Sequence, residues 1–332
     1  MQNQGNIALI SEMLETSRVI RDFDFSRTRG IADEIVDAGR VFIAGEGSSR
    51  IFPGKNFITE GHRLGLDISM GIDGSYQACE YDLSKSVVLV ASNSGQTKET
   101  LALVRKLRSE GHDRLFGVTA TPGSLLDSEV SQSIVLTCGP EKAVAATKSV
   151  VEQALVYQSI LGNIANCSFD ADKIKAAVLA ETVMSAEYDA DLIDRLAKAR
   201  AIFFAGRNNG VAEELALKTT EITHKPCMYL EGTLAFHGVE EIMREDDVVI
   251  FLDPYESEFD KTHEIFEKNV GAKVLALSAN PTPFSTIRTP QLCGFSNYLS
   301  LMAGWNLLVQ TGLRLGVNLD KPNRARKIGN AI

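Results

Sequence analysis

The segment DEIVDAGRVFIAG, residues 33–45, is followed much later in the chain by the similar segment DRLAKARAIFFAG, residues 194–206. The same interval places YDLSKSVVLVAS, residues 81–92, on IMREDDVVIFLD, residues 242–253, without a gap. Two matches at one spacing indicate that a structural unit occurs twice in the chain. We therefore expect the second copy to repeat the fold of the first.

Each copy has the pattern of an α/β fold. Short apolar runs rich in β-branched residues predict strands that are buried on both faces. Three such runs are present in the first copy, at residues 41–44, 87–91 and 115–119. Residues 51–64 and 97–108 lie between these runs and carry apolar side chains at helical spacing. The third run also has its counterpart near residues 274–279. Because strands and helices alternate, we predict the α/β class with a mainly parallel sheet in each copy.

We place the domain boundary between two further predicted helices, residues 143–161 and residues 171–185, where the apolar periodicity lapses. The first domain then covers residues 1–165 and the second covers residues 166–332. A chain of 332 residues is suited to two domains of ordinary size. Each domain contains one copy of the repeat.

The composition excludes several classes of protein. Hydrophobic residues make up 44% and charged residues 23% of the chain, as in globular proteins, and the net charge is −9. An acidic chain is poorly suited to nucleic acid, which is bound through clustered lysine and arginine. No run of eighteen apolar residues and no leader-like N-terminus is present, so we expect no membrane partner and a cytoplasmic protein. The five cysteines lack metal-type spacing, which predicts reduced, buried thiols.

The loop SNSGQT, residues 92–97, follows a predicted strand and precedes a predicted helix. A helix N-terminus offers free backbone N–H groups and a positive dipole end, which favour a phosphate. The hydroxyl groups of Ser92, Ser94 and Thr97 could donate further hydrogen bonds, and Gly95 would allow close approach of the backbone. The alternative interpretation is an ordinary turn with a helix N-cap, for which the same residue types are favoured.

A second loop and the second copy both favour the phosphate site. Ser48 and Ser49, in AGEGSSR after the first predicted strand, would lie at the same edge of the sheet. The second copy has DPYESE at residues 253–258, whose carboxylates would repel a phosphate, so we expect one site per chain. AGEGSSR also lacks the third glycine of the dinucleotide-binding motif, and we therefore expect no nucleotide cofactor.

Together with these loops, LALKTTEITHKPCMYLEGTLAFHG, residues 215–238, resembles the double-SIS phosphosugar isomerase family, which includes the isomerase domain of glucosamine-6-phosphate synthase. The resemblance covers nearly the whole chain. It implies two tandem SIS units, each a flavodoxin-like, three-layer sandwich of a mainly parallel sheet flanked by helices. It also implies that no metal or organic cofactor is needed, and that the chain forms a homodimer in which the loop of His237 reaches into the neighbouring active site.

Matching the family motifs residue by residue implies three groups of site residues. The catalytic residues are Lys218, Glu221, His237 and, in the tail DKPNRARKIGNAI, the Schiff-base lysine Lys327. The sugar-phosphate residues are Ser48, Ser49, Ser92, Asn93, Ser94 and Thr97. Further substrate contacts fall on Gly47 and Val144.

The chain departs from the family pattern at three positions. Leu234 replaces an acidic residue, Val239 replaces the proline of a His-Gly-Pro motif, and Ala146 replaces a serine. Glu231 is a candidate replacement for the lost acid. Since no amide-transfer domain precedes Met1, we expect a stand-alone relative: an amino-sugar phosphate isomerase or deaminase, a ketose/aldose isomerase, or a fructosamine-phosphate deglycase.

The matched residues fit proton transfer between C1 and C2 of an open-chain sugar phosphate. Glu221 would serve as the base if partial burial raised its pKa. Lys218, three residues earlier on the same helix face, would stabilise charge on the enediol oxygen. His237 would shuttle the proton that opens the sugar ring. Lys327 would form an imine with the carbonyl or simply bind the sugar.

Each assignment has a simpler alternative. Lys218 and Glu221 could form an ordinary surface pair, and His237 could be structural. Lys327 could be a solvated charge near the chain terminus. The chain as a whole could also be a sugar-phosphate sensor, because SIS units serve as ligand-binding modules in regulators. Regulators that bind DNA carry a helix-turn-helix domain, for which residues 1–26 are too short and insufficiently basic. We therefore favour an enzyme that acts on a small sugar phosphate.

Overall fold

The computed structural model describes residues 7–324, which contain two five-stranded sheets. The first sheet has the strand order β2-β1-β3-β4-β5, and every neighbouring pair is parallel. Its strands are β1 (Arg40–Gly45), β2 (Ser69–Asp73), β3 (Val87–Ala91), β4 (Leu115–Thr119) and β5 (Gln132–Val135). The three predicted strands are the central ones, β1, β3 and β4, and their residues are almost wholly buried.

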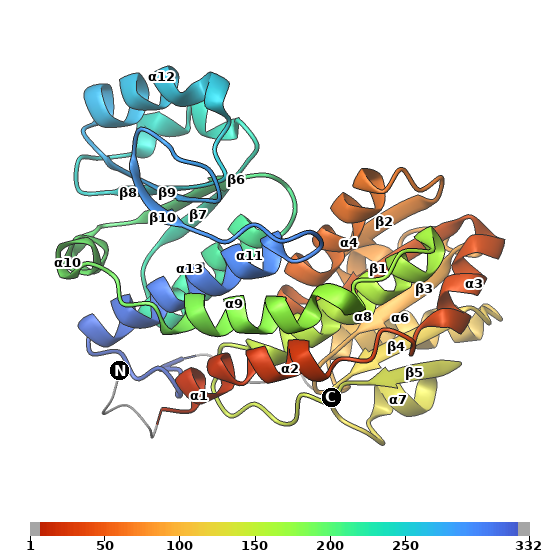
Figure 1. Cartoon of the computed structure of the whole chain (residues 1–332). Helices are drawn as coiled ribbons and strands as arrows, with labels where there is room; N and C mark the ends of the chain where they lie inside the picture. The colour runs from red at the N-terminus through yellow and green to blue at the C-terminus, as the bar shows by residue number, and fades with distance from the viewer. Residues whose placement is uncertain (1–6, 325–332) are drawn as a thin grey trace. The chain divides into compact units, whose positions relative to one another are not determined.

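Helices cover both faces of the first sheet (Figure 1). The crossovers from β1 to β2 and from β3 to β4 run in opposite directions across the sheet, and right-handed crossovers therefore place their helices on opposite faces. On one side α3 and α4 pack against α8, and on the other α6 contacts α5 and α7. The helical segments are α2 (Thr16–Asp22), α3 (Arg29–Ala38), η1 (Gly47–Ser49), α4 (Ile51–Arg63), α5 (Ser75–Ala78), α6 (Lys98–Ser109), α7 (Leu125–Glu129), α8 (Lys148–Ala165) and η2 (Asp170–Asp172).

The second sheet repeats the first. Its order is β10-β9-β8-β6-β7, again with parallel neighbours. Its strands are β6 (Ile202–Gly206), β7 (Cys227–Glu231), β8 (Val248–Leu252), β9 (Lys273–Ser278) and β10 (Ser285–Arg288). Starting from the β7 edge, the strands correspond one by one to those of the first sheet, which confirms the repeat and the predicted fold class.

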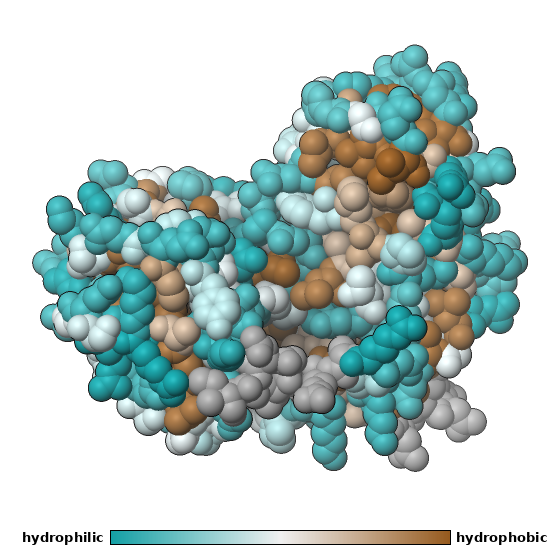
Figure 2. Space-filling model, turned by 180° about the vertical axis from the view of Figure 1, so that it is seen from behind, coloured by the Kyte–Doolittle hydropathy of each residue, from teal (hydrophilic) through white to brown (hydrophobic). Residues whose placement is uncertain are grey.

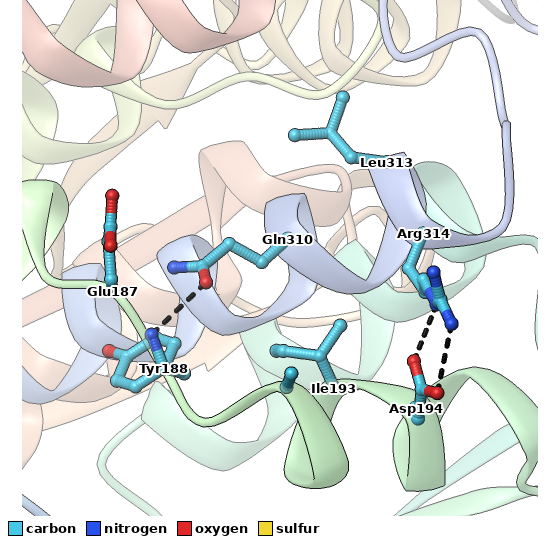
Figure 3. A pocket seen from close by; sticks show the side chains of 8 residues that line it. Glu187, Tyr188, Ile193, Asp194, Gln310, Leu313 and Arg314 are labelled. Atoms are coloured by element: carbon cyan, nitrogen blue, oxygen red, sulfur yellow. Dashed lines mark hydrogen bonds and ion pairs between the residues drawn. The ribbon is translucent and has the colours of Figure 1, made fainter. Parts of the chain in front are cut away.

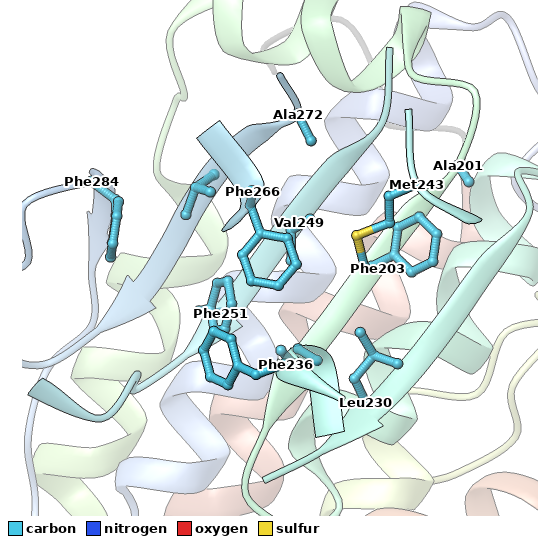
Figure 4. Close-up of a cluster of buried hydrophobic side chains, with 13 residues drawn as sticks. Ala201, Phe203, Leu230, Phe236, Met243, Val249, Phe251, Phe266, Ala272 and Phe284 are labelled. Atoms are coloured by element: carbon cyan, nitrogen blue, oxygen red, sulfur yellow. The ribbon is translucent and has the colours of Figure 1, made fainter. Parts of the chain in front are cut away.

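The second sheet is also covered by helices. On one face, α10 and α11 pack against α13. On the other face the rings of Phe236, Phe251 and Phe266 meet, with centroids 5.6–6.1 Å apart, in a cluster of buried apolar side chains (Figure 4). The helical segments are α1 (Ala8–Leu14), α9 (Lys173–Ser185), α10 (Ala190–Lys198), α11 (Val211–Thr223), η3 (Leu234–Phe236), η4 (Val239–Ile242), η5 (Glu256–Glu258), α12 (Phe259–Thr262), η6 (His263–Val270) and α13 (Ser296–Arg314).

The described residues divide into two compact units, one around each sheet. The unit of the first sheet comprises residues 18–142, 146–174 and 323–324, and the unit of the second comprises residues 7–17, 143–145 and 175–322. Residues 166–174 therefore group with the first sheet. The boundary at residues 165 and 166, as a division between two SIS units, stays a prediction.

Two details differ from the sequence-based expectations. The helix predicted over residues 143–161 begins at Lys148, because the preceding residues form a loop. No disulfide joins the five cysteines, and Cys167 and Cys293 are exposed, so the prediction of buried thiols is wrong for these two. Cys138 is buried, and burial is the main reason why its pKa lies above the ordinary value.

The surface has the character expected from the composition. On the face drawn in Figure 2, hydrophilic side chains predominate and hydrophobic side chains occupy smaller patches. Over residues 7–324, none of the helices combines the length and the apolar character that crossing a lipid bilayer requires.

Candidate active site

Helix α11 carries an ion pair where the sequence predicts the catalytic residues. The Nζ atom of Lys218 lies 2.8 Å from Oε2 of Glu221, one turn further along the helix. It also lies 3.3 Å from Oε1 of Glu214, one turn earlier. The side chains of Lys218 and Glu214 are 1% and 0% exposed, whereas that of Glu221 is 26% exposed. Of the two carboxylates beside Lys218, the one of Glu221 is therefore accessible to a ligand.

The charge of Lys218 is maintained by these neighbours. Burial by itself lowers the pKa of Lys218, but the charges of Glu221 and Glu214 outweigh burial, and the pKa lies above the ordinary value. The side chain therefore remains an ammonium group at neutral pH. A permanent cation beside Glu221 is suited to stabilising negative charge on an oxygen, and it is unsuited to acting as an amine nucleophile.

Glu214 was missed by reasoning from the sequence, although its spacing of four residues before Lys218 was a usable signal. Complete burial of Lys218 was not visible in the sequence. It excludes the alternative in which Lys218 and Glu221 form an ordinary pair on the protein surface.

His237 lies at the end of the short helix η3, in the segment after β7. Its side chain is exposed, and none of the described residues makes a hydrogen bond or ion pair with its ring. The next residue, Gly238, has φ +90°, a left-handed conformation that favours glycine. Glu231, the candidate replacement for the lost acid, is exposed as well. Lys327 lies outside the described residues, so its role stays a prediction.

The SNSGQT loop lies as predicted, between β3 and the N-terminus of α6. Ser92 is buried, and its Oγ lies 2.8 Å from Oγ1 of Thr97. The same Oγ accepts a hydrogen bond from the N–H of Gly95 at 3.1 Å. Ser94 is half-buried, and its Oγ accepts the N–H of Gln96 at 3.2 Å. These bonds curl the loop and leave the hydroxyl proton of Ser94 available to a ligand.

Backbone groups of this loop also remain available. Within the described residues, no hydrogen-bond partner is present for the N–H groups of Asn93 and Ser94. The first turn of α6 adds helix N–H groups that have no partner within the helix. This combination of donors suits an anion, since unpaired N–H groups and a helix N-terminus both favour negative charge.

Gly95 is required by its surroundings. Its φ of +62° lies in the left-handed region, and a Cβ atom at this position would lie 2.0 Å from Oγ of Ser124. The space is therefore occupied by the protein itself. The sequence-based explanation, close approach of a ligand to the backbone, is at most a part of the reason for this glycine.

The second predicted loop leaves the same edge of the sheet. Ser48 and Ser49 lie in η1, directly after β1, which is the parallel neighbour of β3. Both serines are half-buried, and Gln153 of α8 donates a hydrogen bond to the carbonyl oxygen of Ser49. Gly47 has φ +51°, which a residue with a side chain rarely adopts. Two serine-containing loops thus follow two neighbouring strands.

Val144 is half-buried in the segment before α8 and groups with the unit of the second sheet. Its predicted contact with a sugar stays a prediction, as do the predicted roles of the other site residues.

A groove of ≈ 410 Å³ lies beside α13 (Figure 3). Arg314 forms an ion pair with Asp194 at one end of it, and Gln310 accepts the N–H of Tyr188 at 3.2 Å. None of the predicted site residues that the structure describes lines this groove. We therefore assign it no part in the predicted chemistry.

Among known protein families, the model of the SIS domain matches residues 195–285 of the chain. The chain is 26% identical over 317 residues to glutamine–fructose-6-phosphate aminotransferase (isomerizing) from Listeria innocua, an alignment that covers 90% of this chain and 52% of that protein. The chain spans about half the length of the curated relatives that it matches.

Solved structures are similar over almost the whole chain. Tagatose-6-phosphate ketose/aldose isomerase from Escherichia coli gives a TM-score of 0.77 at 16% identity and covers 97% of this chain and 98% of its own. Glucosamine-6-phosphate deaminase from Thermotoga maritima gives a TM-score of 0.74 at 20% identity and covers 96% of this chain and 98% of its own. At this identity the likeness concerns the fold, and it confirms the predicted arrangement of two tandem SIS units.

Proposed function

Because the chain carries a SIS domain within a tandem SIS fold, we propose that it is a phosphosugar isomerase acting on a ketose or amino-sugar 6-phosphate. The observation that supports this proposal most strongly is the pair on α11. Lys218 is a buried cation held between two carboxylates, and the carboxylate of Glu221 is partly exposed. A base and a fixed positive charge side by side are what proton transfer next to a carbonyl group requires.

In the proposed reaction, Glu221 removes the proton from C2 of the open-chain aldose and returns it to C1, or the reverse. The electron pair of the broken C–H bond forms the double bond of an enediol, and the carbonyl oxygen gains negative charge. Lys218 stabilises that charge through its ammonium group. The hydroxyl proton of O2 passes to O1, and the C2 carbonyl forms as the carboxylate returns the other proton to C1. The carboxylate then recovers its original state, so no co-reactant is consumed.

His237 and Lys327 complete the proposed mechanism. The exposed imidazole of His237 transfers the proton that opens the sugar ring. Lys327 forms an imine with the open-chain carbonyl or binds the sugar. We also propose a homodimer in which His237 acts in the site of the neighbouring subunit. The cytoplasmic location inferred from the sequence stays a prediction.

The phosphate group is proposed to bind at the edge of the first sheet. Its ligands would be Ser48 and Ser49 together with the SNSGQT loop, in which Asn93 and Ser94 offer backbone N–H groups that donate to none of residues 7–324. Ser94 also offers its hydroxyl proton. Gly47 lies in the first of these loops, and Val144 is proposed to contact the sugar.

A substrate panel tests the proposed function. The protein is incubated with fructose, glucose, tagatose and glucosamine 6-phosphates and with fructosamine 6-phosphates, and isomeric sugars, ammonia and amines are measured together. Formation of an isomeric sugar phosphate is expected. Release of an amine from a fructosamine phosphate would instead identify a deglycase, and binding without turnover across the panel would identify a sensor.

The role of Glu221 is tested separately. The variant Glu221→Gln keeps the size of the side chain but cannot take up a proton. We expect turnover to fall by about two to four orders of magnitude, with affinity for the sugar phosphate changed little, because the base acts in the transition state. An equal loss of affinity and turnover would contradict this role.

A further inference from the structure

Glu141 contacts the SNSGQT loop, although nothing in the predicted chemistry uses it. Its Oε2 accepts a hydrogen bond from the hydroxyl group of Ser149 and lies 3.4 Å from Nδ2 of Asn93. Its Oε1 accepts the N–H of Thr147 at 2.8 Å, immediately before α8. Nδ2 of Asn93 donates in turn to Oγ of Ser149 at 2.8 Å. Asn93, Ser149 and Glu141 therefore form a continuous hydrogen-bonded relay.

The carboxylate determines the direction of this relay. An ionised carboxylate can only accept hydrogen bonds, so Ser149 must donate its single proton to Glu141. The Oγ of Ser149 is then an acceptor for Asn93, and the Asn93 side chain must present its NH₂ group to Ser149. The choice between the two orientations of the amide follows from Glu141.

The consequence lies on the other side of the amide. With the NH₂ group engaged by Ser149 and Glu141, the side-chain oxygen Oδ1 of Asn93 is left facing away from them, and none of the described residues donates to it. A carbonyl oxygen repels a phosphate dianion but accepts a hydrogen bond from a hydroxyl or ammonium group.

We infer that Glu141, acting through Ser149, is a positioning residue that makes Asn93 present a carbonyl acceptor to a donor group on the sugar. This inference rests on the proposed function, because it assigns the ligand to the SNSGQT loop. Asn93 then has two roles: its backbone N–H donates a hydrogen bond to the phosphate, and its side-chain carbonyl accepts a hydrogen bond from the sugar.

The decisive variant is Ser149→Ala. It removes the nearer of the two acceptors of the Asn93 amide, at 2.8 Å, and leaves the hydrogen bonds between Glu141 and Thr147 in place. The matched control is Thr121→Ala, because the Thr121 hydroxyl donates at 3.1 Å to the backbone oxygen of Asn93 and not to its side chain. Both variants lose one hydrogen bond to the same residue.

The first measurement needs no ligand. The side-chain amide of Asn93 is observed by NMR in protein labelled with ¹⁵N-asparagine and is assigned by its disappearance in Asn93→Asp. We expect its exchange with solvent to be at least about tenfold faster in Ser149→Ala and in Glu141→Gln than in the wild type, and unchanged in Thr121→Ala. Equal exchange rates in the wild type and Ser149→Ala would overturn the inference.

The second measurement uses two probes, fructose 6-phosphate and inorganic phosphate, in titration calorimetry. Ser149→Ala is expected to weaken binding of fructose 6-phosphate by about three- to tenfold, the value of one neutral hydrogen bond, and to change phosphate binding less than about twofold. Equal loss for both probes, or no loss for either, would overturn the assigned role of the carbonyl. If wild type binds neither probe, the proposed function fails, and the exchange measurement alone decides whether the relay positions Asn93.

Discussion

Lys218 is a buried ammonium group whose charge is balanced by two carboxylates on its own helix. Replacing it by methionine would leave the fully buried Glu214 without its cation. We expect Lys218→Met to lower the free energy of unfolding by about 3–5 kcal/mol, the usual effect of removing one partner from a buried pair. Urea unfolding followed by circular dichroism measures this difference.

Glu221→Gln serves as the control for that measurement. Glu221 is partly exposed, and in its absence Lys218 keeps Glu214. The free energy of unfolding should therefore fall by less than about 1 kcal/mol. If the two variants were equally destabilised, the distinction between a structural carboxylate at position 214 and an accessible one at position 221 would be wrong.

The effect of Lys218 on stability should depend on pH in a defined direction. Burial lowers its pKa, but Glu221 and Glu214 more than reverse this, so the pKa in the folded protein lies above that in the unfolded chain. Below the pKa of lysine in the unfolded chain, about 10.4, such a group contributes its full stabilisation, and this contribution is lost as the pH rises through the pKa in the folded protein.

The difference in unfolding free energy between wild type and Lys218→Met should therefore be constant from about pH 7 to 9 and decrease only above about pH 10. A decrease already between pH 7 and 9, seen in urea unfolding at each pH, would contradict the raised pKa.

At the scale of single residues, the sequence predicts which residues lie close together along a helix, but it does not predict how deeply they are buried or which distant segments contact them. The spacing of Lys218 and Glu221 on one helix face is correctly predicted, because it depends only on helix geometry. The burial of Lys218 and the contact of Glu141 with Asn93 depend on tertiary packing between segments far apart in the chain. No local pattern encodes such contacts, and Glu141 was for this reason not among the predicted site residues.

At the scale of elements, the loop between β3 and α6 depends on Gly95. The variant Gly95→Ala would place a Cβ atom 2.0 Å from Oγ of Ser124 and force alanine into φ +62°. The left-handed conformation alone costs about 1–2 kcal/mol, and the overlap adds to it, so we expect a loss of more than about 2 kcal/mol in unfolding free energy. Thermal unfolding would measure this loss of stability. We also expect weaker binding of inorganic phosphate, which titration calorimetry would measure.

A double variant separates the two causes. Adding Ser124→Gly to Gly95→Ala removes the overlap and keeps the unfavourable φ, although it also removes the hydroxyl that caps α7 by accepting the Asp127 N–H. The double variant should therefore remain less stable than Ser124→Gly alone by about 1–2 kcal/mol. If the double variant and Ser124→Gly were equally stable, a side chain at position 95 would cost nothing in the left-handed conformation, and this explanation would be wrong.

The sequence predicts best those elements whose environment leaves a clear pattern of apolar residues. The central strands β1, β3 and β4 are continuous apolar runs because both of their faces are covered. All four edge strands, β2, β5, β7 and β10, were missed, because most of their residues are exposed or only partly buried and their sequences contain few β-branched apolar residues. The late start of α8 was missed for a different reason: residues 143–147, AVAAT, have a composition that suits a helix although they form a loop.

At the scale of the whole molecule, two sheets of identical strand order differ in the loops that follow equivalent strands. The loop after β3 carries serine and threonine, whereas the loop after β8 carries Asp253, Glu256 and Glu258. A cation that contacts the second loop is already engaged: the guanidinium carbon of Arg207 lies 4.4 Å from the ring centroid of Tyr255, and Arg207 donates to the carbonyl oxygen of Asp253. A duplicated fold therefore need not contain a duplicated site.

We accordingly expect one phosphate site per chain. Titration calorimetry with inorganic phosphate or fructose 6-phosphate should give one bound ligand per chain, whatever the number of chains in the assembly. Ser94→Ala should weaken binding by about tenfold or more, since a hydrogen bond to a charged group contributes about 1.5–3 kcal/mol, and it should leave no second class of site behind. Glu256→Gln should leave affinity and stoichiometry unchanged. Two ligands per chain in the wild type, or full binding to half of the sites in Ser94→Ala, would show that the second sheet has kept a phosphate site despite its acidic loop.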